Sequence, residues 1–148
     1  MPEPKTLQLT VDVPAPPRTV FAAATDWGAQ HEWMLGTRVR ADRHQGRGVG
    51  GGIAAFTGVG PLGFWDTMII TRWDEPKVVQ VDHTGKVVRG IGVFRVERAG
   101  NGSRLVWREE VDLPLGWLGG PGWYVVKPVL AAAVALSLRR FARFAVRA

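Results

Sequence analysis

The sequence predicts an α+β domain in which a long C-terminal helix covers one face of a curved antiparallel sheet. Two observations support this prediction. Six strand-like segments follow one another after residue 37 with short turns between them, an order typical of an antiparallel meander. One amphipathic helical segment then ends the chain, and it is the segment long enough to cover such a sheet.

The first part of the chain predicts one strand followed by two short helices. Residues 5–13 alternate between apolar and polar side chains with a period of two, which is typical of a half-buried strand. The prolines at 14, 16 and 17 end this strand, and proline suits the first turn of a helix. A second short helix, capped by Asp26, is expected to reach Trp33 and Met34.

The middle of the chain predicts the other strands, at 37–43, 49–57, 64–73, 78–83, 87–97 and 104–113. Segment 37–43 contains few apolar residues and several charged ones, a composition that favours an edge strand. Asn101–Gly102 predicts a hairpin turn between the last two strands. The glycine-rich segments 45–48 and 58–63 are expected to form a turn and a loop.

A helix is expected from the region of Trp123 to the end of the chain. Its apolar stripe has spacings of three and four residues and consists of Val126, Leu130, Val134, Leu138, Phe141 and Ala145. Pro128 suits a first helical turn and is an alternative start. Segments 58–63 and 114–122 both carry glycines, which permit movement.

Composition excludes several classes of function. The 148 residues suit one domain, 1–148, and the lack of cysteine removes thiolate catalysis, zinc–cysteine sites and disulfides. It also fits a reducing, cytoplasmic location. His31 and His44 have no partners at metal-ligand spacing, so we expect no metal. The G-x-G-x-x-G match at 58–63 precedes a strand-like run instead of a helix, and no cofactor is expected.

The formal net charge of +6 raises the question of nucleic-acid or membrane partners. Its one concentration, Arg139, Arg140, Arg143 and Arg147, suits a solvated helix end better than a nucleic-acid interface, because no nucleic-acid motif accompanies it. The longest apolar run, 123–138, is too short and too interrupted to span a bilayer. We expect membrane contact to be transient at most. Edge strand 37–43 and the region of Trp117 are candidate dimer surfaces, although the sequence fixes no oligomeric state.

Strand alternation predicts which side chains face the covered side of the sheet. Three ionisable groups fall on that side, Asp66, His83 and Glu109, and these are the candidate catalytic residues. A buried acid needs a partner or a raised pKa, and such a group can orient a ligand or move protons. The alternative is a position at the rim, or pairing with Arg72 or Arg89. The predicted ligand contacts are Trp33, Met68, Ile70, Val81, Phe94, Val96, Trp107, Tyr124, Val126 and Leu130; for Tyr124 a surface position is an equal alternative.

Several local patterns carry a family resemblance over nearly the whole chain. They are Pro14–Phe21, Thr25–Trp27 with Glu32–Met34, Arg72–Lys77, and Gly100–Trp107. In this order they resemble the START/polyketide cyclase-like (SRPBCC) superfamily. The resemblance implies the helix-grip fold, with sheet order 1-7-6-5-4-3-2 wrapped around the C-terminal helix and a cavity between them. In that fold, loops between strands and the start of the last helix surround the cavity mouth, so we expect either 58–63 or 114–122 to gate entry.

Three functions remain open, because this fold serves many. The first is binding of a small hydrophobic ligand, such as a lipid or polyketide, which needs the cavity and its aromatic walls. The second is a polyketide cyclase, aromatase or dehydratase, with the inward acids or His83 moving protons. The third is a toxin-like interaction protein that acts through its basic helix end. The arginine-rich, lysine-poor composition suggests a bacterial, GC-rich genome.

Overall fold

The computed structural model describes residues 5–59, 61–86, 88–112 and 121–147. Within them one antiparallel sheet has the order β1-β7-β6-β5-β4-β3-β2, as the resemblance implied. Its strands are β1 (Lys5–Val13), β2 (Thr37–Ala41), β3 (Gly52–Val59), β4 (Leu62–Asp74), β5 (Val78–Thr84), β6 (Arg89–Ala99) and β7 (Gly102–Asp112). The charged strand β2 is one edge of the sheet, as its composition predicted, and β1 is the other.

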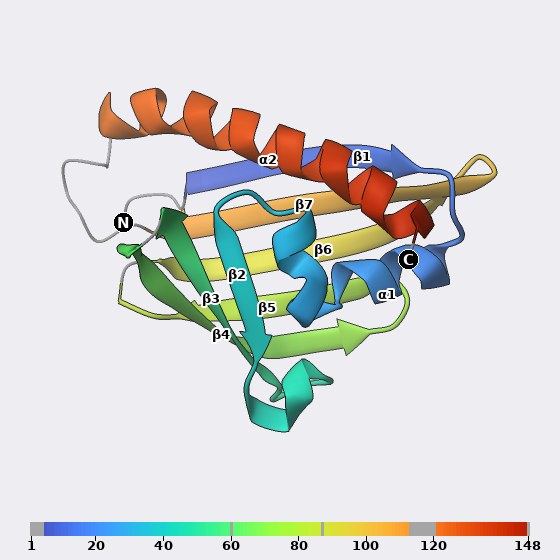
Figure 1. Cartoon of the computed structure of the whole chain (residues 1–148), viewed down its shortest axis with the longest axis horizontal. Coiled ribbons are helices and arrows are strands. Elements are labelled where there is room, and N and C mark those ends of the chain that lie inside the picture. Colours follow the sequence, from blue (N-terminus) through green and yellow to red (C-terminus); the bar gives the residue numbers. More distant parts are fainter. Residues whose placement is uncertain (1–4, 60, 87, 113–120, 148) are drawn as a thin grey trace.

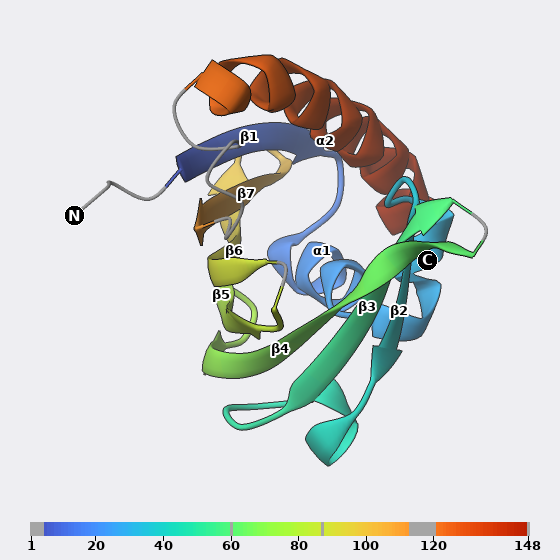
Figure 2. The same cartoon turned by 90° about the vertical axis from the view of Figure 1, so that its left-hand side faces the viewer.

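Four helical segments complete the fold: α1 (Pro17–Ala24), the 3-10 helices η1 (Trp27–Glu32) and η2 (Arg43–Gly46), and the long α2 (Pro121–Arg147). Figure 1 shows α2 lying along β1 and β7. Figure 2 shows the sheet curling from β1 round to β2, with α1 inside the curve. This is the predicted α+β helix-grip architecture, with two short helical segments between β1 and β2.

The glycine-rich segment 58–63 was expected to be a loop, and the structure corrects this. Gly58 pairs with Gly63 and Val59 with Leu62, so β3 and β4 continue almost to the turn. A Cβ at Gly58 would collide with the carbonyl oxygen of Leu62, so these glycines allow the two strands to approach closely. The other predicted gate, 114–122, lies mostly outside the described residues.

Three smaller expectations also change. β2 ends at Ala41, and η2 replaces the predicted turn at 45–48. Asp26 precedes η1 but makes no side-chain capping hydrogen bond. α2 begins at Pro121, so Pro128 lies inside the helix and does not mark its start. None of the described helices is long and apolar enough to cross a lipid bilayer.

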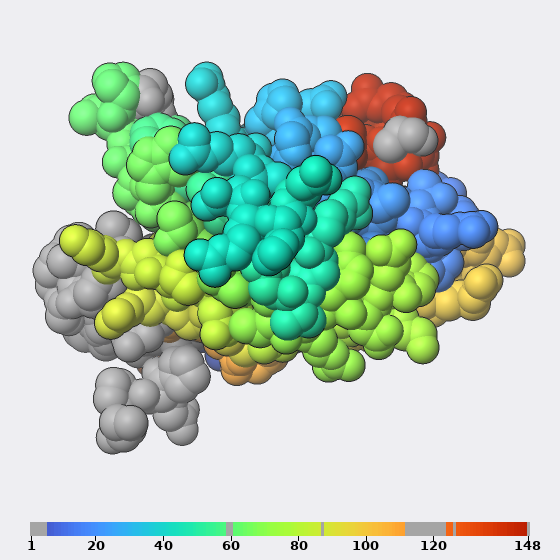
Figure 3. Space-filling view, turned by 90° about the horizontal axis from the view of Figure 1, so that it is seen from below, coloured from blue at the N-terminus to red at the C-terminus, as the bar shows by residue number. Residues whose placement is uncertain are grey.

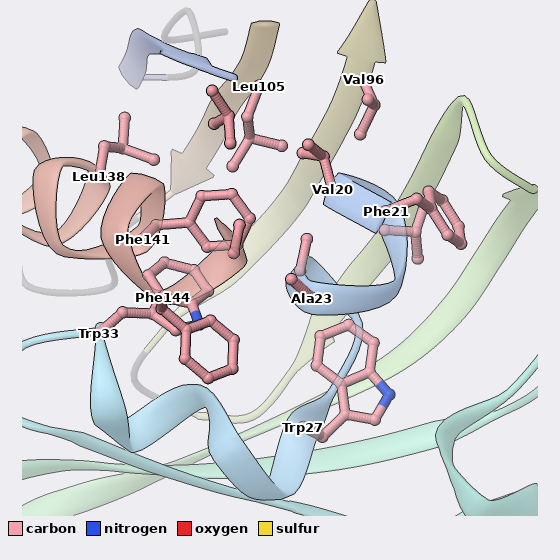
Figure 4. Close-up of a cluster of buried hydrophobic side chains, with 14 of the residues drawn as sticks. Val20, Phe21, Ala23, Trp27, Trp33, Val96, Leu105, Leu138, Phe141 and Phe144 are labelled. Atoms are coloured by element: carbon pink, nitrogen blue, oxygen red, sulfur yellow. The ribbon is translucent and has the colours of Figure 1, made fainter. Parts of the chain in front are cut away.

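The hydrophobic core fills the space between the sheet, the short helices and the C-terminal half of α2 (Figure 4). Leu138, Phe141 and Ala145 of the predicted stripe are fully buried. The Phe141 ring lies 4.8 Å from that of Trp33, edge to face. On the side seen in Figure 3, η2 and its flanking strands β2 and β3 form the middle of the surface. This core closes one end of the space beneath α2 and leaves the other end free for a cavity.

Candidate functional site

An apolar cavity of about 280 Å³ lies between the concave face of the sheet, η1 and α2. Hydrophobic side chains make up most of its wall, and Leu130, Ala133 and Val134 contribute from α2. Its polar wall includes Asp66, His83 and Glu109 together with Gln30 and Ser137. Such a wall, apolar with a few converging polar groups, is typical of a small-molecule site.

The three ionisable residues predicted to face inward are joined in one hydrogen-bonded network. The Nδ1 of His83 lies 2.9 Å from Oδ1 and 3.0 Å from Oδ2 of Asp66. Its Nε2 lies 2.9 Å from Oε2 of Glu109. The protonated imidazole therefore donates to both carboxylates. This differs from the alternative of separate pairing with Arg72 or Arg89.

Two glycines on β6 make this network possible. His83 on β5 and Glu109 on β7 lie on opposite sides of β6 and pair there with Gly90 and Gly92, respectively. Because successive inward positions of β6 carry no side chain at this point, the imidazole and the carboxylate can meet above the strand. Asp66 reaches the same place from β4, two residues before Met68, which pairs with His83.

Trp107 completes the network from β7. Its indole Nε1 donates to Oε1 of Glu109 over 2.9 Å, two residues along the same face of the strand. The same ring packs against Phe94 and Trp33, with centroid distances of 5.5 Å and 6.1 Å. Both oxygens of Glu109 therefore accept a hydrogen bond from the protein, which fixes the orientation of this carboxylate.

The environment of His83 favours its protonated form. Burial alone would lower the pKa of His83, but the hydrogen bonds to Asp66 and Glu109 and the attraction of both carboxylates outweigh it. Together they raise the pKa from 6.5 to about 10. At neutral pH the ring is an imidazolium with both N–H groups engaged. It therefore serves as a fixed positive charge and not as a free base.

The predicted ligand contacts divide into four groups. Five line the cavity: Met68, Val81, Phe94, Trp107 and Leu130. Trp33, Ile70 and Val96 are buried in the packed core and are not among the lining residues, because neighbouring side chains cover them. Tyr124 is 79% exposed, in agreement with the surface alternative. The side chain of Val126 lies outside the described residues.

Four polar wall residues were missed: Gln30, Thr37, Thr57 and Ser137. Gln30 lies on the short η1 helix, where no periodic pattern indicates which side chain faces inward. Ser137 lies three residues after Val134 on α2, so helical spacing alone would have found it. Its hydroxyl accepts a hydrogen bond from the backbone N–H of Leu35 at 3.1 Å and ties α2 to the segment after η1.

Other candidate sites receive less support from the geometry. Within the described residues no cluster of three His, Cys, Asp or Glu side chains has the geometry of a metal site. At the basic end of α2, Arg140 donates to the carbonyl oxygen of Glu32 and Arg147 to that of Arg143. These two arginines take part in local contacts of the helix end.

The curled sheet, its covering C-terminal helix and the cavity between them define the helix-grip class. The chain belongs to the family described as "Polyketide cyclase / dehydrase and lipid transport", whose profile matches residues 4–145. No functionally curated protein matches it in sequence. The comparisons therefore establish the family but name no specific ligand.

Solved structures share this fold at low sequence identity. TTHA0849 from Thermus thermophilus has a TM-score of 0.82 at 15% identity, covering 97% of this chain and 98% of that one. Ara h 8.0201 has a TM-score of 0.68 at 12% identity, with coverages of 97% and 99%. StfQ, a di-domain ARO/CYC protein of the steffimycin biosynthetic pathway, has a TM-score of 0.74 at 12% identity; 96% of this chain covers 50% of it.

Proposed function

We propose that the protein binds a small hydrophobic molecule, such as a lipid or polyketide, in the cavity between the sheet and α2. The observation that carries the proposal is the apolar cavity of about 280 Å³. Protein interiors are otherwise packed to the density of organic crystals, so a space of this size is a feature that the fold maintains. We place the activity in the bacterial cytoplasm, which suits a cysteine-free chain, with residues 1–148 acting as one domain.

A buried amide on the cavity wall also supports binding. Gln30 is 4% exposed and lines the cavity. Its amide is not one of the fully enclosed polar atoms without a partner, which among the described residues are represented by Nε1 of Trp33, so the amide keeps access to the cavity. A molecule in the cavity that carries a polar atom near Gln30 would therefore find a hydrogen-bonding group on the wall.

The test uses two alanines that are neighbours on α2. Ala133 lines the cavity, whereas Ala132 is exposed. Ala133→Phe should fill part of the cavity, and Ala132→Phe adds the same side chain on the solvent side. Native mass spectrometry of the freshly purified proteins, followed by extraction, would detect a bound apolar molecule. We expect it in the wild type and the Ala132 variant, and little in the Ala133 variant.

Two results would count against binding. One is an empty wild-type protein that also fails to take up a panel of fatty acids and aromatic polyketides. The other is equal loading of the two variants, which would place the bound molecule elsewhere. Folding of both variants is checked by circular dichroism, so that loss of the cavity is separated from loss of the fold.

A second candidate function is acid–base chemistry on the bound molecule, of the kind a polyketide cyclase or dehydratase requires. The network favours it, because two carboxylates face a substrate-sized space and His83 holds them in place. Asp66 and Glu109 are then the proton-transfer groups. The test is deuterium exchange next to the carbonyl of bound 2-octanone in D₂O. Glu109→Gln should retain binding and lose exchange; an unchanged exchange rate would remove Glu109 from this role.

A further inference from the structure

The polar end of the cavity carries more negative than positive charge. The two carboxylates share one imidazolium, which leaves one formal negative charge. No lysine or arginine is present among the described residues that line the cavity. The charge is therefore balanced neither by the network nor by the rest of the described wall.

The network offers hydrogen-bond acceptors, and its own N–H donors are already used. Both N–H groups of His83 and the indole N–H of Trp107 are already engaged with carboxylate oxygens. A carboxylate has about four lone-pair positions, so Asp66 and Glu109 retain capacity to accept. Their side chains are 13% and 22% exposed, so part of each carboxylate remains accessible.

A second wall residue points independently to a ligand. Gln30 is buried on η1, away from the network in the chain, and it lines the cavity with an amide that can both donate and accept. The cavity wall thus has an acceptor-rich, negatively charged network and a separate amide. A ligand that hydrogen-bonds to both the carboxylates and the Gln30 amide would be mainly apolar and would carry more than one polar group.

We propose that the cavity selects an apolar molecule bearing a protonated amine, and that the ammonium group lies against Asp66 and Glu109. The inference rests on the proposed binding function and adds the chemical class of the ligand. An ammonium group supplies N–H donors and the missing positive charge together. An alcohol supplies the donor without the charge, and a carboxylate ligand would be repelled.

The experiment compares octylamine, 1-octanol and octanoate, three probes of equal chain length, at pH 7.5. Binding is measured by isothermal titration calorimetry. We expect octylamine to bind at least about tenfold more tightly than octanoate, with octanol between them, as a charge-assisted hydrogen bond provides. The net charge of +6 attracts anions to the protein as a whole, so the overall charge would not produce a preference for the amine.

Two variants locate the source of the preference. Glu109→Gln removes the charge with nearly the same shape, and should reduce the amine-to-octanoate ratio about tenfold while octanol binding changes little. Glu97→Gln removes the same charge from an exposed position on β6 outside the cavity wall, and should retain the wild-type ratio. The wild-type comparison alone decides the inference if the Glu109 variant does not fold.

The outcomes separate the inference from the proposed function. Octanoate or octanol binding as tightly as octylamine would overturn the amine selectivity and leave the hydrophobic site standing. A wild-type preference for the amine that survives in Glu109→Gln would assign it to another part of the protein and overturn the placement. Failure of all three probes to bind would overturn both proposals.

Discussion

Gly92 on β6 lies directly opposite Glu109 on β7, and a Cβ at this glycine would come within 3.0 Å of Glu109 Oε1 and 3.1 Å of Oε2. Those two oxygens accept hydrogen bonds from Trp107 and His83, so they cannot move aside without lengthening a bond. The network therefore requires that position 92 carries no side chain. It makes Gly92 a positioning residue for the carboxylate.

Gly92→Ala should displace the Glu109 carboxylate and weaken its bond to His83. Because that bond helps to raise the pKa of His83, we expect the pKa to fall from about 10 towards 6.5. An NMR pH titration of the imidazole resonances measures it. Gly28→Ala is the matched control, since a Cβ there meets nothing within 4 Å. A pKa that does not change in Gly92→Ala would show that the carboxylate tolerates the added methyl group.

The network also shows which features of the site can be predicted from sequence patterns and which cannot. Period-two alternation placed Asp66, His83 and Glu109 on the inward face correctly, because every strand obeys it regardless of its neighbours. Whether these three side chains hydrogen-bond to one another depends on the register of strands β4 to β7. It also depends on the two glycines of β6, the strand that lies between β5 and β7. Register is a relationship between strands, and no single segment of sequence contains it.

The fold was predictable for a similar reason, and its turns were less so. Strands, edge and covering helix follow from patterns that extend over many residues. At 58–63 a glycine-rich composition predicted a loop, whereas the glycines permit close strand pairing. Both structures favour glycine, so composition alone could not distinguish them. Some inward-facing residues are packed in the core, as Ile70 is, whereas others line the cavity, as Met68 does. Which of the two applies depends on neighbours that are far away in the chain.

The raised pKa of His83 predicts how the free energy of unfolding depends on pH. Protonation of His83 stabilises the folded state, and this contribution is fully present below pH 6.5, the ordinary pKa. It is lost as the pH rises from 6.5 to about 10. We therefore expect the wild-type melting temperature to fall over this interval. Thermal melts at pH 6, 8 and 10 followed by circular dichroism would measure it.

A histidine substitution isolates this contribution from other groups that titrate in the same interval. His83→Gln should be less stable at pH 6 and should show a shallower fall towards pH 10. His31→Gln serves as the control, because His31 is exposed and its side chain hydrogen-bonds to the carbonyl oxygen of Gly28, away from the network. If the melting temperatures of wild type and His83→Gln fell equally steeply with pH, protonation of His83 would not contribute to the stability of the folded state.

The packing of α2 predicts an unequal effect along one helix. Phe141 is fully buried against Trp33, so Phe141→Ala removes a large side chain from the packed end of the core. We expect a loss of about 3–5 kcal/mol in the free energy of unfolding, from lost burial and the new cavity. Val129 on the same helix is 69% exposed, and Val129→Ala should change stability by less than about 0.5 kcal/mol. Urea denaturation gives both values, and comparable losses would mean that α2 is not held by its C-terminal half.

Two glycines beside η2 allow backbone strain to be separated from packing. Gly46 and Gly48 have nearly the same positive φ, +67° and +69°, so alanine is strained at either position. A Cβ at Gly48 meets nothing within 4 Å, whereas one at Gly46 would lie 2.6 Å from Cδ1 and Nε1 of Trp27. Trp27 also donates from Nε1 to the carbonyl oxygen of Gly46 at 2.8 Å, and its ring reaches the cavity wall.

Gly48→Ala should therefore cost about 1–2 kcal/mol in the free energy of unfolding, the strain of a left-handed alanine. Gly46→Ala should cost at least about 1–3 kcal/mol more, because the indole must move and its hydrogen bond is lost. Urea denaturation compares the two variants, and tryptophan fluorescence should shift in the Gly46 variant alone. Equal costs would mean that the segment around η2 adjusts to the added methyl group, and that Trp27 is not held in place by Gly46.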